Sequence, residues 1–173
     1  MPERLPIPVL MSSLVTLLTE AYAGPADPRE TWFVDHAPDA GILGLIAGIS
    51  EAEASASMAG TGARGSTIAA NVEHLRWSLA NVNKTLRGQG WNPDWAASWE
   101  LLSVDEAGWN RLREALREEF ETLCGLLRQQ VALPAEHLLG LLALAPHAAW
   151  HLGLMRQMIE RVREEAAADP VTG

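Results

Sequence analysis

The fold is decided by residues 66–87, which read STIAANVEHLRWSLANVNKTLR. The apolar residues along this stretch recur in steps of four and three: Ile68, Val72, Leu75, Leu79, Val82 and Leu86. This spacing places them on one side of a helix, as in the buried seam of a helical bundle. We therefore predict a long helix over 66–87, with Ser66 as its N-cap and with Gly88 and Gly90 ending it.

Similar apolar spacing predicts three further long helices, over about 6–24, 103–130 and 134–165. Prolines at the start of the first of these fit the opening turn of a helix. Ser103 and Glu106 form a capping-box pattern that would begin the second. Pro146 lies inside the last helix, where it removes a backbone hydrogen bond and should kink or loosen one turn.

The segment between the first two long helices has a different character. Residues 25–41 contain three prolines and are expected to be irregular. A short helix is predicted over 41–49. Ser50 and Glu53 then form a capping-box pattern, which predicts another short helix over 51–58.

Four long helices in a chain with almost no β-patterned run predict an all-α fold. We expect residues 1–173 to form one domain, a four-helix bundle with short extra helices between the first and second long helices. Short links favour antiparallel neighbours, whereas the segment 24–65 is long enough for a crossover. A chain of 173 residues can bury a sizeable core without disulfides. A metal would therefore serve function rather than folding.

Composition excludes several classes of protein. The 22 acidic and 13 basic residues give a net charge of -9, so the cationic surface that nucleic acids or anionic membranes require is absent. Cys124 is the only cysteine, which excludes an internal disulfide and Cys₄ or Cys₂His₂ zinc sites. The N-terminus has no signal-peptide pattern, and we see no apolar run of the ~18 residues that a membrane span requires. We predict a cytoplasmic protein.

His147 and His151 are the first candidates for chemistry. Their i, i+4 spacing puts both imidazoles on one face of the last helix, one turn apart. They interrupt a stripe that is otherwise apolar, and buried imidazoles need partners for their ring nitrogens. Two interpretations stay open: a shared metal ion, or two core histidines bonded to backbone or water. No glutamate lies between them, which argues against a zinc protease of the HExxH type.

A third ligand is expected from another helix, and His74 is the candidate. It lies at the edge of the apolar seam of the 66–87 helix, in a row with polar residues that could support a site: Thr67, Asn71, Trp77, Ser78 and Asn81. The alternative is a surface histidine on a polar face. His36 and His137 are expected to be structural or solvated. Three neutral imidazoles with an open position suit Zn²⁺ or Ni²⁺.

The connection over 88–102 is rich in tryptophan. Trp91, Trp95 and Trp99 either plug the open end of the bundle or line a mouth over the metal. Cys124 lies next to the core face of its helix and is expected to be a packing residue rather than a nucleophile.

The chain resembles the DinB-like superfamily of helical metalloproteins. The resemblance rests on residues 71–77, NVEHLRW, and residues 147–157, HAAWHLGLMRQ. The stretch 41–44, the Trp95/Trp99 segment and Trp109 also fit. The resemblance implies a bundle with a His₃ site made of His74, His147 and His151, and it implies a homodimer. It also implies thiol-dependent S-transferase or isomerase chemistry with a thiol such as bacillithiol or mycothiol.

Three functions are therefore open. The first is an enzyme whose divalent metal binds a small thiol as thiolate for transfer to an electrophile. The second is a hydrolase that uses metal-activated water. The third is a non-catalytic, dimeric metal-binding or stress protein. No residue beyond the ligands is assigned a catalytic role. The expected binding partners are a small-molecule thiol or electrophile, and neither nucleic acid nor a membrane is expected to bind.

Overall fold

The computed structural model describes residues 5–37, 39–58 and 63–168, and every regular element in these ranges is helical. The prediction of an all-α chain is confirmed for this part. The long helices are α1 (Ile7–Ala23), α4 (Ile68–Leu86), α5 (Glu106–Arg128) and α6 (Ala135–Ala168). The shorter elements are α2 (Ile42–Ala47), α3 (Glu51–Ser55) and the 3₁₀ helix η1 (Trp95–Trp99).

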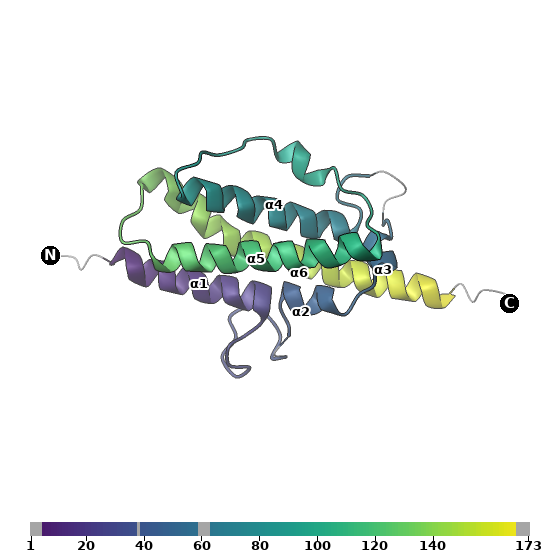
Figure 1. Cartoon of the computed structure of the whole chain (residues 1–173). Coiled ribbons are helices and arrows are strands. Elements are labelled where there is room, and N and C mark those ends of the chain that lie inside the picture. Colours follow the sequence, from purple (N-terminus) through teal and green to yellow (C-terminus); the bar gives the residue numbers. More distant parts are fainter. Residues whose placement is uncertain (1–4, 38, 59–62, 169–173) are drawn as a thin grey trace.

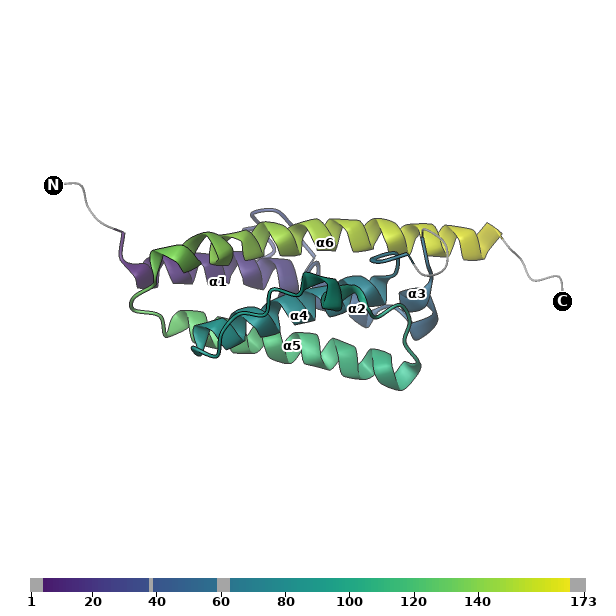
Figure 2. The same ribbon diagram turned by 90° about the horizontal axis from the view of Figure 1, so that it is seen from above.

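The four long helices lie side by side in two parallel pairs (Figures 1 and 2). α1 and α6 run in one direction, and α4 and α5 run in the other. The short link between α5 and α6 joins antiparallel helices, but these two lie diagonally across the bundle, and each packs instead against α1 and α4. The crossover, however, is the connection between α4 and α5, which returns along the outer side of α4 (Figure 1). The sequence predicted no crossover at this place and allowed one only over residues 24–65.

A single apolar core fills the space between these helices. The predicted seam of α4 is buried at Ile68, Val72, Leu75 and Leu79. One face of α5 is also buried, at Trp109, Leu112, Leu116, Phe120, Leu123, Cys124 and Leu127. Trp109 is 2% exposed, and its indole nitrogen donates to the Ile49 carbonyl oxygen at 3.0 Å. This contact joins the start of α5 to the turn between α2 and α3.

The ends of the helices differ in part from prediction. Ser50 and Glu53 form both bonds of the predicted capping box. Thr67, and not Ser66, caps α4, where its hydroxyl accepts from the Ala70 amide. The capping box at Ser103 and Glu106 is wrong: Asp105 caps α5, and its carboxylate accepts from the Gly108 amide at 2.6 Å. A carboxylate directly before the first turn is a stronger acceptor than a hydroxyl two residues earlier.

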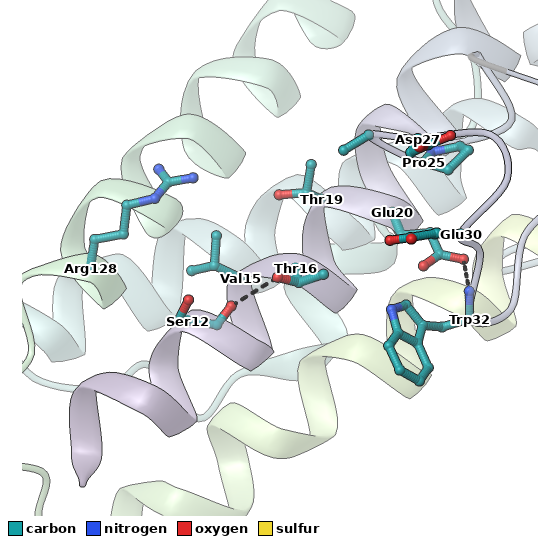
Figure 3. A pocket seen from close by; sticks show the side chains of 11 residues that line it. Ser12, Val15, Thr16, Thr19, Glu20, Pro25, Asp27, Glu30, Trp32 and Arg128 are labelled. Atoms are coloured by element: carbon teal, nitrogen blue, oxygen red, sulfur yellow. Dashed lines mark hydrogen bonds between the residues drawn. The ribbon is translucent and has the colours of Figure 1, made fainter.

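The irregular segment 25–41 is held to the bundle by buried polar groups. Glu20 is 3% exposed, and its Oε1 atom accepts three backbone N–H groups, from Trp32 (2.7 Å), Phe33 (2.8 Å) and Val34 (3.0 Å). Figure 3 shows Glu20 and Trp32 in the wall of a cavity of about 390 Å³ beside α1. The chain then approaches α1 so closely that a Cβ on Gly41 would lie 2.5 Å from the Gly24 nitrogen.

α6 runs without a break through Pro146, which lies on the exposed side of the helix. One 18-residue window of α6 has a mean hydropathy of 1.4, so length and composition alone would allow this helix to span a membrane. The sequence-based expectation that no apolar stretch is long enough to span a membrane is therefore wrong for α6. Core helices of soluble proteins pass the same test, and α6 packs one face against α1 and α4.

Candidate metal centre

The antiparallel contact of α4 with α6 brings three imidazoles to one point. His74 comes from the middle of α4, and His147 and His151 come from successive turns of α6. Nε2 of His147 lies 3.1 Å from Nε2 of His74 and 3.1 Å from Nε2 of His151. One possible ligand atom of each residue lies within 4.8 Å of the others. The predicted convergence of these histidines is confirmed.

Burial separates this cluster from an ordinary surface group. His74 is 5% exposed and His151 is 1% exposed, while His147 is half-buried. The interpretation of His74 as a surface histidine is therefore wrong. Pro146 does not turn His147 away from the cluster, because the ring reaches both other imidazoles.

The spacing of the nitrogens suits one small cation. Three nitrogens at about 2.0–2.1 Å from a tetrahedral ion lie roughly 3.3 Å apart. The two 3.1 Å separations are close to this value. The three histidines can therefore hold one divalent ion after small side-chain shifts.

Hydrogen bonds orient the first of the two buried rings. The Ser98 hydroxyl donates to the Trp95 carbonyl oxygen at 2.7 Å, so its oxygen is left to accept from Nδ1–H of His74, also at 2.7 Å. A proton on Nδ1 leaves the Nε2 lone pair of His74 directed at His147.

The second buried ring is oriented in the same way. The Asn71 amide nitrogen donates to the carbonyl oxygens of Gly65 and Thr67. Its Oδ1 atom therefore accepts from Nδ1–H of His151 at 2.9 Å. Both rings thus present an unprotonated Nε2, which is the form that ligates a metal.

These tautomers leave the cluster rich in lone pairs. A proton on Nε2 of His147 has two acceptors at equal distance, and a proton on its Nδ1 leaves three lone pairs facing one another. A single cation accepts all three lone pairs at once. The arrangement therefore suits a metal ion.

Electrostatics keep the three imidazoles neutral. Burial, with the neighbouring His147 as the second cause, lowers the pKa of His74 to about 4 and that of His151 to about 3. Burial also lowers the pKa of His147. At neutral pH the rings are therefore uncharged, and a metal does not compete with a second proton on any of them.

The tryptophan-rich connection covers this cluster rather than the end of the bundle. Trp99 stacks on His74 with a centroid distance of 3.9 Å and an interplanar angle of 13°, and Trp95 lies 5.7 Å from the same ring. Asn81 holds the connection on α4, since its amide donates to the Asn92 carbonyl and its Oδ1 accepts from the Asn92 amide. The second interpretation of the tryptophans, a lining over the site, fits this geometry.

The other candidates lie elsewhere. Nδ1 of His36 is bonded to the Pro28 carbonyl oxygen, and His137 lines a cavity with Trp91. Burial raises the pKa of the Cys124 thiol, which makes it a packing residue and a poor nucleophile. Within the described ranges no carboxylate joins the histidine group.

Sequence reasoning found Asn71 as a possible supporting residue but missed Ser98. Asn71 lies one turn before His74 on the same helix, so helical spacing reveals it. Ser98 reaches His74 only because the crossover folds back along α4. The one signal for it is its place between Trp95 and Trp99.

Comparisons with known proteins do not identify a relative of this chain. No family model matches the chain, no curated protein matches it significantly, and no solved structure does.

Proposed function

We propose that the protein is a metal-dependent S-transferase in which His74, His147 and His151 hold one Zn²⁺ or Ni²⁺ ion. The observation that carries the proposal is the meeting of three neutral imidazoles, with Nε2 of His147 3.1 Å from Nε2 of each of the two oriented rings, His74 and His151. The resemblance to the DinB-like superfamily supports it, and with it a homodimeric, cytoplasmic protein. The homodimer is tested by light scattering after size-exclusion chromatography.

Thiol transfer fits the site better than hydrolysis. A bound divalent cation would favour the thiolate form of a thiol that reaches it. Metal-activated water would hydrolyse a substrate more efficiently beside a general base, and no carboxylate of the described residues joins the histidines. Ser98 and Asn71, the nearest polar groups, already hold the two buried rings.

The proposed reaction is a substitution by sulfur. The thiol gives up its proton to solvent, and its sulfur forms a bond with an electrophilic carbon of the second substrate. The leaving group departs with the electron pair of the bond that breaks. The role of the chain is to hold the ligands neutral and to shield the reacting atoms from water.

The first test is metal content. Purified protein analysed by mass spectrometry should hold about one Zn²⁺ or Ni²⁺ per chain, and His151→Ala should hold none while its circular dichroism stays helical. His137→Ala is the matched control, because it removes a histidine from the same helix outside the cluster. Equal metal content in His151→Ala and wild type would refute the site.

The second test is turnover. Metal-loaded protein should accelerate conjugation of bacillithiol or mycothiol with a chlorinated aromatic electrophile, and His151→Ala should not. Ester hydrolysis without conjugation would favour the hydrolase. Metal binding with neither activity would favour the non-catalytic, dimeric metal-binding or stress protein.

A further inference from the structure

A cavity of about 400 Å³ opens beside the histidine cluster. It lies between α4, the first half of α6 and the tryptophan-rich connection, and His147 forms part of its wall. Its other walls include Val82, Leu144, Trp91 and Trp95. A volume of this size falls within the range of about 300–1,000 Å³ found for small-molecule sites.

The lining of this cavity is apolar and aromatic. Among the described residues that line it, His147 is the one titratable side chain and Ser78 the one hydroxyl. The Trp91 and Trp95 rings lie 5.6 Å apart at an angle of 54°, and each indole keeps at least 40% of its surface exposed. Two indoles that are packed on one side and open on the other offer flat surfaces to a flat ligand.

The cavity continues past Trp91. A second cavity of about 230 Å³ shares Val82, Trp91 and Gly140 with the first and reaches His137. A Cβ added to Gly140 would meet no atom within 4 Å. The absence of a side chain at position 140 therefore leaves room where the two cavities meet.

We propose that these joined cavities bind a neutral, flat, apolar molecule of one or two aromatic rings, held against Trp91 with one end at His147. That this molecule is the electrophilic substrate rests on the proposed S-transferase function. Binding of the molecule itself does not depend on the metal. Among the described residues that line these walls there is no carboxylate, lysine or arginine, and the titratable groups are the imidazoles of His137 and His147, so the site favours a neutral ligand over a charged one.

The experiment measures binding of 1-naphthol by calorimetry to metal-free and metal-loaded protein. Gly140→Leu should weaken binding at least tenfold, because the new side chain occupies the ligand's space, and leucine favours a helix more than glycine does. Trp91→Ala should weaken it about fivefold. Gly125→Leu is the matched control, since it also fills open space beside a helical glycine but lines neither cavity. In the metal-free protein, where no cation can attract the phosphate, 1-naphthyl phosphate should bind at least tenfold more weakly than 1-naphthol.

The outcomes separate this proposal from the metal function. If wild type and Gly140→Leu bind 1-naphthol equally, or neither binds it at millimolar concentration, the cavity proposal is overturned even if metal and turnover are found. If His151→Ala loses metal yet keeps its 1-naphthol affinity, the cavity proposal stands. If wild type binds no metal but Gly140→Leu still abolishes 1-naphthol binding, only the S-transferase function falls.

Discussion

Two regions of this molecule use buried polar groups to hold an irregular segment on a helix, and they differ in how completely those groups are paired. At Glu20, which Figure 3 shows beside Trp32, three backbone N–H groups converge on one carboxylate oxygen, so donors and acceptor satisfy one another. At the histidine cluster, Ser98 and Asn71 satisfy the Nδ1 side of two rings, but the three Nε2 atoms face each other with too few protons. The first arrangement is complete within the chain, whereas the second suits an added cation.

The largest effect is expected at Glu20, where every donor has its acceptor within the chain. Glu20→Ala should leave three N–H groups of a partly buried segment without their acceptor, at a cost of about 3 kcal/mol or more in the free energy of unfolding. Urea denaturation measures this loss. Glu20→Gln keeps one acceptor oxygen and should lose roughly half as much. Metal content per folded chain should not change in either variant; a loss in Glu20→Gln would mean that the two regions are coupled.

The next largest effect is the stabilisation of the fold by a metal ion at the histidine cluster. Zn²⁺ or Ni²⁺ at 100 times its dissociation constant should stabilise the fold by about 2.7 kcal/mol. The thermal midpoint should rise accordingly, and a chelator should return it to its starting value. His151→Ala should show no such rise. A rise of the same size in His151→Ala would place the ion somewhere other than this cluster.

Ser98→Ala sharpens the comparison, because it removes the group that orients His74 without removing a ligand. Loss of such a partner weakens metal binding by about 10- to 100-fold. Competition with a chromogenic chelator measures the change. Ser98→Thr keeps the hydroxyl and should restore most of the affinity. An unchanged affinity in Ser98→Ala would show that stacking on Trp99 alone orients the ring.

The smallest effect is that of pH on metal affinity near neutrality. In the folded chain the pKa values of His74 and His151 lie at about 4 and 3, below the value of 6.5 for a free imidazole. Burial also lowers the pKa of the third ligand, His147, below 6.5. Metal affinity should therefore change little between pH 8 and pH 7 and should fall at lower pH, towards pH 4, as protons compete for the three rings. A titration of affinity against pH would contradict this if the fall were centred near 6.5.

The same pKa values set the sign of the pH effect on the metal-free fold. Because the folded pKa values lie below the unfolded one, the unfolded chain takes up protons first as pH falls. The stability that the neutral imidazoles allow is present above pH 6.5 and is lost progressively towards pH 4 and 3. Urea denaturation of chelator-treated protein at several pH values measures this loss.

Local sequence determined the helices and the histidine pair. The apolar steps of four and three over 66–87 repeat with the turn of a helix, so they identify both the helix and its buried side without any other part of the chain. The i, i+4 spacing of His147 and His151 is local in the same sense. His74 was identifiable as a candidate because it lies on a helix beside the seam, next to polar neighbours such as Asn71.

Tertiary structure alone decided how these parts meet. The pairing of α4 with α6 put His74 against His147, and no spacing in the sequence measures that distance. The crossover along α4 brought Ser98 to His74, and Trp91 and Trp95 to the cavity beside His147, across many intervening residues. These contacts depend on how whole helices pack in the assembled core. Helical periodicity, in contrast, is a local property that a few turns of sequence are enough to show.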